Sequence, residues 1–156
     1  MKYRSKKTVL LGFGGHSKVV IEILKLRGIQ IDYIIDPKSN LKLISNSILL
    51  PEVIELKKYE KSTKIFSMYF GTGDLKKRRE ILNEVQSSLT NFCFPTLTHP
   101  NSIVYPDARI GQGSQIFALA VVGPNAQVGE FTVLNHGCII DHDSIIGNFS
   151  NISPNV

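Results

Sequence analysis

The last third of the chain carries a six-residue repeat. Nine aliphatic residues recur at intervals of six: Val104, Ile110, Ile116, Val122, Val128, Leu134, Ile140, Ile146 and Ile152. Four residues after each of the first eight comes a small side chain: Ala108, Ser114, Ala120, Ala126, Thr132, Cys138, Ser144 and Ser150. A period of six fits neither a helix nor a single open strand. It predicts a solenoid of short parallel strands, a β-helix whose inward positions alternate between bulky and small side chains.

The corners of this coil are expected directly after the aliphatic positions. Six of those positions are followed by residues that tolerate unusual backbone angles: Gly111, Gly123, Gly129, Asn135, Asp141 and Gly147. The sequence ends in mid-hexad at Val156. The expectation is therefore a C-terminally truncated β-helix.

The first 95 residues alternate apolar runs with amphipathic stretches, which predicts a small Rossmann-like parallel sheet with helices on its faces. Strands are expected at 8–11, 29–35, 47–50, 65–70 and 91–94. Helices are expected from the turn at 12–17 to Gly28, from Pro51 to about Glu60, and from Leu75 to about Leu89. Two prolines, at 95 and 100, separate this α/β domain (1–95) from the β-helix (96–156).

Ligands of a parallel sheet bind at the carboxyl ends of its strands. Gly12 and Gly14 follow the first strand and open a helix, where backbone N–H groups can approach an anion. A dinucleotide-dependent oxidoreductase is one alternative, with Asp36 on the ribose, but Ser17 stands where its third glycine belongs. A purely structural turn is another. The pattern favours nucleotide or phosphate binding without redox chemistry.

Net charge, apolar run length and cysteine spacing limit the ligands and the cellular location that the sequence can indicate. The formal net charge of +5 favours anionic ligands. The apolar run at 8–11 is too short for a signal peptide or a membrane span, which predicts a cytoplasmic protein. Cys93 and Cys138 show no metal-binding or redox spacing, so we expect buried, reduced thiols and no metal.

Four motifs, in order, resemble those of bacterial hexapeptide-repeat sugar acetyltransferases, which modify nucleotide-linked amino sugars or sialic acid. They are residues 11–20 (LGFGGHSKVV), Gly73-Asp74 followed by Arg78, residues 97–100 (LTHP), and the hexads. The resemblance implies an N-terminal domain that holds a UDP- or GDP-amino sugar, and a left-handed β-helix. It also implies a homotrimer that binds acetyl-CoA between neighbouring subunits. Acetyl-CoA is then a co-substrate, with no tightly bound cofactor and no nucleic acid or membrane partner.

The resemblance also assigns residues. The substrate-binding set it implies is Gly12, Gly14, Gly15, His16, Asp36, Lys38, Gly73 and Asp74. In the hexad register His142 projects outward, and with Asp143 it matches the catalytic pair of the family. Asn151 stands where relatives often carry a second histidine that contacts acetyl-CoA.

Several other candidate residues are expected to have no direct role in the reaction. Lys76, Lys77, Arg78 and Arg79 are expected to be a solvated first helical turn. We expect no role for His136 and a structural role for His99. Cys138 faces inward and makes a poor nucleophile.

The function expected from this resemblance is acetyl transfer to the amino group of a nucleotide-linked amino-deoxysugar for surface glycans, with His142 as general base. One alternative is a sialic acid O-acetyltransferase. The other is a non-catalytic module that binds nucleotide sugars or serves assembly.

Overall fold

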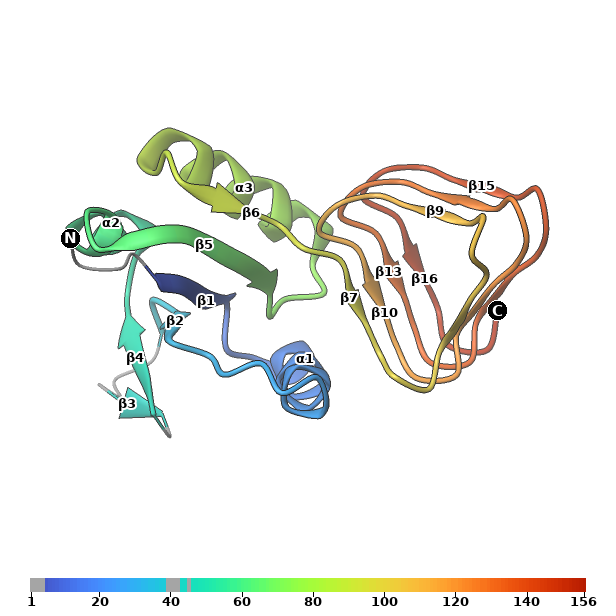
Figure 1. Ribbon diagram of the computed structural model, residues 1–156, viewed down its shortest axis with the longest axis horizontal. Coiled ribbons are helices and arrows are strands. Elements are labelled where there is room, and N and C mark those ends of the chain that lie inside the picture. Colours follow the sequence, from blue (N-terminus) through green and yellow to red (C-terminus); the bar gives the residue numbers. More distant parts are fainter. Residues whose placement is uncertain (1–4, 39–42, 45) are drawn as a thin grey trace. The chain divides into compact units, whose positions relative to one another are not determined.

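The computed structural model describes residues 5–38, 43–44 and 46–156, and the chain divides into two compact units, Met1–Phe94 and Pro95–Val156 (Figure 1). Each unit has its own β-sheets.

The described part of the N-terminal unit is built on a sheet with the strand order β3-β4-β2-β1-β5-β6. The strands are β1 (Ser5–Leu11), β2 (Tyr33–Ile35), β3 (Leu43–Ile44), β4 (Ser47–Leu50), β5 (Thr63–Phe70) and β6 (Phe92–Cys93). All neighbours pair in parallel except β3, which runs antiparallel to β4. Figure 1 shows β1 between β2 and β5, and Val9, Leu10 and Leu11 are fully buried there. The predicted parallel sheet is confirmed.

The helices of this unit are α1 (Gly15–Leu26), the 3-10 turn η1 (Val53–Leu56), α2 (Lys57–Glu60) and α3 (Leu75–Ser88). Helix α1 buries Val20, Ile23 and Leu24 and ends before Gly28, whose φ of +66° is the left-handed conformation expected after a helix. The helix expected from Pro51 begins instead at Val53, as a 3-10 turn.

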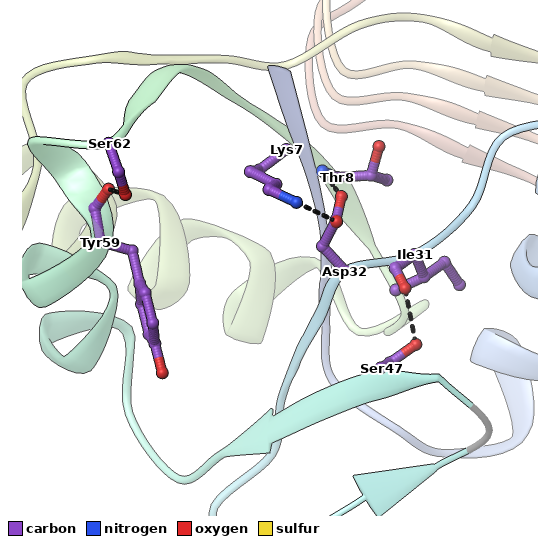
Figure 2. A network of polar contacts seen from close by, with 7 residues as sticks. All are labelled: Lys7, Thr8, Ile31, Asp32, Ser47, Tyr59 and Ser62. Carbon is purple, nitrogen blue, oxygen red and sulfur yellow. Dashed lines mark hydrogen bonds and ion pairs between the residues drawn. The ribbon is translucent and has the colours of Figure 1, made fainter. Parts of the chain in front are cut away.

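The second strand is shorter than the sequence predicts, and polar side-chain contacts surround the residues that precede it. The carboxylate of Asp32 accepts hydrogen bonds from Lys7 Nζ at 2.7 Å and from the Thr8 backbone N–H at 2.8 Å (Figure 2). Ser47 Oγ donates to the carbonyl oxygen of Ile31 at 2.7 Å (Figure 2). The backbone of Asp32 is also bonded to both neighbouring strands, since its N–H donates to the carbonyl oxygen of Thr8 and its carbonyl oxygen accepts from Ile48. The paired residues of β2 start at Tyr33.

The C-terminal unit is a three-sided parallel β-helix, as predicted. Its walls are the strand stacks β16-β13-β10-β7, β14-β11-β8 and β15-β12-β9. Figure 1 shows β7, β10, β13 and β16 of the first wall side by side. The strands are β7 (Leu97–Thr98), β8 (Ile103–Val104), β9 (Arg109–Ile110), β10 (Gln115–Ile116), β11 (Val121–Val122), β12 (Gln127–Val128), β13 (Val133–Leu134), β14 (Ile139–Ile140), β15 (Ile145–Ile146) and β16 (Asn151–Ile152). Hexad aliphatics and small residues together fill the interior: Ile116, Ala120, Val122, Ala126, Val128, Leu134, Cys138 and Ile140.

The prediction for the corners is wrong in its geometry. Positive φ angles occur two residues later than expected and recur every six residues: Gly113, Leu119, Asn125, Phe131, Gly137, Asp143, Phe149 and Asn155. Three of the four glycines expected at the corners, Gly111, Gly123 and Gly129, serve close packing instead, whereas a Cβ atom on Gly147 would meet only Ser150 Oγ at 3.9 Å. A Cβ atom on Gly111 would lie 2.5 Å from the backbone nitrogen of Glu130, and one on Gly123 would lie 2.8 Å from that of His142. Successive coils therefore approach too closely for a side chain at these positions.

Candidate functional site

A cavity of about 540 Å³ opens at the carboxyl ends of β1, β2 and β5. Its walls are the turn after β1, the end of β2 and the turn after β5: Gly12, Phe13, Gly14, Gly15, His16, Asp36, Lys38, Gly71, Thr72, Gly73 and Lys77. Seven of the eight residues assigned to substrate line it. The exception is Asp74, whose carboxylate accepts the backbone N–H groups of Lys76 and Lys77 and so caps helix α3.

A second cavity of about 540 Å³ shares four residues with the first, namely Gly12, Asp36, Lys38 and Lys77. Its walls include apolar side chains from several elements: Leu11, Ile35, Pro37, Val53 and Ile81. Beyond the shared wall these apolar side chains stand beside Glu52, Glu80 and Glu84. The two cavities together suit an elongated ligand with an anionic part at the shared lysines and a part that combines apolar surface with hydrogen-bond donors.

Asp36 holds two loops together. Its Oδ2 accepts the backbone N–H of Phe13 at 2.7 Å, and its Oδ1 accepts that of Lys38 at 2.8 Å. The carboxylate thereby ties the turn after β1 to the end of β2. Its contact with a ligand stays a prediction.

The two glycine turns meet at Gly12 and Gly71. The backbone N–H of Gly71 donates to the carbonyl oxygen of Leu11 at 2.7 Å. A Cβ atom on Gly71 would overlap the carbonyl oxygen of Gly12, whose own φ is +96°. By contrast, Cβ atoms on Gly14 and Gly15 would meet no atom within 4 Å. Glycine at 71 is required by packing, whereas glycine at 14 and 15 keeps the cavity open.

Arg78 lies behind the first cavity, and the expectation that it is solvated is wrong. Its exposed fraction is 0%. Its Nε donates to the carbonyl oxygen of Thr72 at 2.7 Å, its Nη2 donates to Nε2 of His16 at 3.1 Å, and its guanidinium lies 5.2 Å from the ring centre of Phe70. Burial lowers the pKa of this guanidinium to about 10. It points inward because it shares a helix face with Leu82 and Val85, and that i, i+4, i+7 spacing was a signal available in the sequence.

The second group of predicted residues lies on the β-helix, after strand β14. The side chain of His142 is 68% exposed, so the imidazole projects outward as the hexad register predicts. Its Nδ1 pairs with Oδ2 of Asp143 at 2.8 Å. The other carboxylate oxygen of Asp143 accepts Nδ2 of Asn125 at 2.6 Å, from 18 residues earlier in the chain. The three side chains form one hydrogen-bonded series, of which the sequence analysis missed Asn125.

This series sets the protonation of the pair. The hydrogen bond to Asp143, followed by the charge of Asp141, raises the pKa of the His142 imidazole above its ordinary value. Hydrogen bonds from His142 and Asn125 lower the pKa of the Asp143 carboxyl. A neutral His142 then keeps its proton on Nδ1, next to the carboxylate. Nε2 remains as the ring nitrogen that can accept a proton.

The remaining candidates lie elsewhere in the β-helix unit. Asn151 is on β16, and its Oδ1 accepts Nδ2 of Asn135 at 2.7 Å. The imidazole of His136 lies 5.2 Å from the ring centre of Phe117. His99 Nδ1 accepts the backbone N–H of Asn101 at 3.0 Å, within a turn. Cys138 is fully buried, and burial raises the pKa of its thiol, which disfavours the reactive thiolate.

Two further properties concern the described residues as a whole. They contain no group of three or more histidine, cysteine, aspartate or glutamate side chains arranged to hold a metal ion. Among them, too, no helix has the length and apolar character that a membrane crossing requires.

Solved structures share this fold. The acetyltransferase domain of PglB from Neisseria gonorrhoeae FA1090, in complex with acetyl coenzyme A, is 28% identical with a TM-score of 0.81, and the match covers 96% of this chain and 71% of that one. PerB from Caulobacter crescentus, in complex with CoA and GDP-perosamine, is 24% identical with a TM-score of 0.81 over 95% of this chain and 69% of that one.

Sequence comparison adds a curated relative and family matches. The GDP-perosamine N-acetyltransferase of Escherichia coli O157:H7 is 34% identical over 59 residues, which are 38% of this chain and 27% of that protein. The match thus spans about a quarter of the length of this relative. The bacterial transferase hexapeptide model (six repeats) matches residues 119–154. The PglD N-terminal domain model matches residues 7–85, half of the chain, and the protein therefore belongs to the PglD N-terminal domain family, with hexapeptide repeats following that domain.

Proposed function

We propose that the protein transfers the acetyl group of acetyl-CoA to the amino group of a UDP- or GDP-linked amino-deoxysugar for surface glycan synthesis. The observation that carries this proposal is the pairing of His142 Nδ1 with Asp143, which leaves Nε2 of an exposed imidazole for the acceptor. The names of similar proteins support it, since a curated relative is a GDP-perosamine N-acetyltransferase and the PglB domain is an acetyltransferase bound to acetyl coenzyme A.

The reaction follows from this geometry by direct transfer. The neutral sugar amine attacks the thioester carbonyl carbon, and His142 Nε2 accepts the proton that the nitrogen loses. The tetrahedral intermediate then collapses, the carbon–sulfur bond breaks, and the imidazolium returns the proton to the CoA thiolate. Asp143 stabilises the imidazolium and holds the ring in the required tautomer, as the carboxylate of a hydrolase triad does.

The two adjoining cavities support a nucleotide-linked acceptor. Lys38 and Lys77 line both cavities and supply positive charge for a diphosphate. The backbone at residues 12–16 leads into helix α1, whose first N–H groups favour anions. The apolar walls of the second cavity give space for a nucleoside.

The test compares His142→Ala with His136→Ala, which removes another exposed imidazole of the same β-helix. Release of free CoA thiol is followed with acetyl-CoA and a panel of UDP- and GDP-amino sugars. Loss of the base is expected to lower kcat by about 10²- to 10⁴-fold with little change in KM, as removal of a general base usually does. The His136 variant is expected to stay within a few-fold of the unaltered protein.

Unlinked sialic acid is the control acceptor in the same panel. Turnover with sialic acid and with no nucleotide-linked sugar would identify the protein as a sialic acid O-acetyltransferase and contradict the proposed N-acetylation. Retained nucleotide-sugar binding without any turnover would support a non-catalytic module. Activity of His142→Ala within a few-fold of the unaltered protein would remove His142 from the base role.

A further inference from the structure

Arg78 connects the two glycine turns that line the first cavity. Its Nη2 contacts His16, at the start of α1, and its Nε contacts the carbonyl oxygen of Thr72, in the turn after β5. Both His16 and Thr72 line the cavity, while Arg78 is fully buried behind them. A buried charged side chain is costly unless it is hydrogen bonded, so this arrangement has a structural cost that a solvated arginine would avoid.

In the hydrogen bond between Arg78 and His16, the arginine must be the donor and the imidazole the acceptor. A guanidinium has five N–H donors and no acceptor, and with a pKa of about 10 Arg78 is protonated at neutral pH. In the pair with Arg78 Nη2 at 3.1 Å, Nε2 of His16 is therefore the acceptor and carries no proton. A neutral imidazole with an unprotonated Nε2 carries its proton on Nδ1.

Gly73 accommodates this ring position. A Cβ atom at residue 73 would lie 3.1 Å from Nδ1 of His16, closer than ordinary van der Waals contact. Both residues line the first cavity. The imidazole and Gly73 thus pack against each other in the cavity wall, where a side chain at position 73 would displace the ring.

We propose that Arg78 is a positioning residue that holds His16 as the neutral Nδ1–H tautomer and fixes it to the turn after β5, so that Nε2 is occupied by Arg78 and any hydrogen bond from the ring to a ligand is donated by Nδ1. The ligand atom it recognises is then an acceptor, such as a phosphate or hydroxyl oxygen. That the ligand is a nucleotide sugar rests on the function proposed above. The protonation state of His16 does not.

The first measurement is the 15N NMR spectrum of protein labelled at its four histidines. His16→Gln identifies the His16 signals by removing them. At pH 7 we expect a protonated Nδ1 and an unprotonated Nε2 for His16. A protonated Nε2 in the unaltered protein, either as the other tautomer or as the cation, overturns the proposal.

The second measurement uses Arg78→Met, with Arg79→Met as the matched control on the exposed face of the same helix. Arg78→Met is expected to mix the two His16 tautomers and to raise the KM for the nucleotide sugar roughly tenfold, as loss of a hydrogen bond to a charged group does. The KM for acetyl-CoA and kcat are expected to stay within about twofold. Unchanged His16 signals in a folded Arg78→Met protein contradict the positioning role.

Arg78→Lys covers the case in which the methionine variant does not fold. Lysine keeps the charge and the donors but lacks the planar fork that reaches His16 and Thr72 together. We expect the lysine to keep a hydrogen bond to either His16 or Thr72. The KM for the nucleotide sugar should therefore rise less than in Arg78→Met. If no acetyl transfer is found with any acceptor while His16 shows the Nδ1–H tautomer, the proposed function fails and the assignment of the tautomer stands.

Discussion

At the scale of single residues, both carboxylate oxygens of Asp143 are hydrogen bonded. One carboxylate oxygen pairs with His142 and the other accepts from Asn125, so the carboxylate cannot rotate without losing a hydrogen bond. The side chain is nevertheless 64% exposed, and solvent screens its charge. Its contribution is therefore expected in the orientation and protonation of His142 rather than in stability.

Asp143→Asn tests this through the pH dependence of the reaction. The carboxylate raises the pKa of His142, and a general base must be unprotonated, so the wild-type rate rises with pH through that raised value. Without the carboxylate the pKa of His142 falls, although Asp141 still raises it in part. The rise in kcat/KM is expected at lower pH, with a lower plateau because the tautomer is no longer fixed.

The control for this profile is Asp107→Asn, an exposed aspartate elsewhere on the β-helix. Its pH profile should match that of the unaltered protein. An Asp143→Asn profile that stays in place or moves to higher pH would contradict the assignment of Asp143.

The hexads made His142 predictable, because the register fixes which side chains point outward. Asn125 was missed because its partner lies 18 residues away, although stacking the hexads three at a time places it directly beside Asp143. Arg78 was missed for a different reason. A run of basic residues normally indicates a solvated helix face, and this outweighed the spacing of Arg78 with Leu82 and Val85; the partners Phe70, His16 and Thr72 come only with the structure.

At the scale of elements, the end of β5 approaches the turn after β1 more closely than any side chain allows. Gly71→Ala would place a methyl group on the carbonyl oxygen of Gly12. We expect the two turns to separate, with lower thermal stability and weaker nucleotide-sugar binding. The effect on stability is expected to be about 1–3 kcal/mol, the usual cost of overpacking.

Gly14→Ala is the matched variant. Its Cβ meets no atom within 4 Å, so its melting temperature should equal that of the unaltered protein, while the added methyl group enters the cavity and weakens binding. Equal stability loss in both variants would contradict the close approach at Gly71. Differential scanning calorimetry and a nucleotide-sugar titration separate the two effects.

Periodicity predicted the elements better than their ends. The central strands and helix α1 were placed within a few residues, because apolar runs and Gly28 mark them. The strand predicted at 29–35 is too long at its start, because the residue at which pairing begins depends on the alignment with β1 and β4, which are distant in sequence. The corners were misplaced because glycine has two uses, left-handed backbone and close packing, and the sequence alone did not separate them.

At the scale of the whole molecule, one wall of the β-helix carries an outward column of aliphatic residues. Val121 pairs with Ile103 on one side and with Ile139 on the other. Ile103 is 57% exposed and Ile139 is 61% exposed. A column of aligned, exposed aliphatics is a candidate association surface, and it supports the proposed homotrimer.

Ile139→Lys places a charge in this column, and Gln127→Lys places one at an exposed polar position on another wall. Light scattering is expected to give a trimer for the unaltered protein and for Gln127→Lys, and a smaller species for Ile139→Lys. Because acetyl-CoA is expected to bind between subunits, turnover should fall with the trimer. A trimeric Ile139→Lys protein would remove this column from the interface.

The left-handed position of Asp143 limits how this protein can evolve. None of the eight residues with positive φ in the β-helix is β-branched, and most side chains are disfavoured in that conformation by about 1–2 kcal/mol. Asparagine and glycine tolerate it. Exchange of Asp143 for either residue would keep the coil intact while removing the carboxylate that fixes the tautomer of His142, so the architecture would outlast the full rate of the reaction.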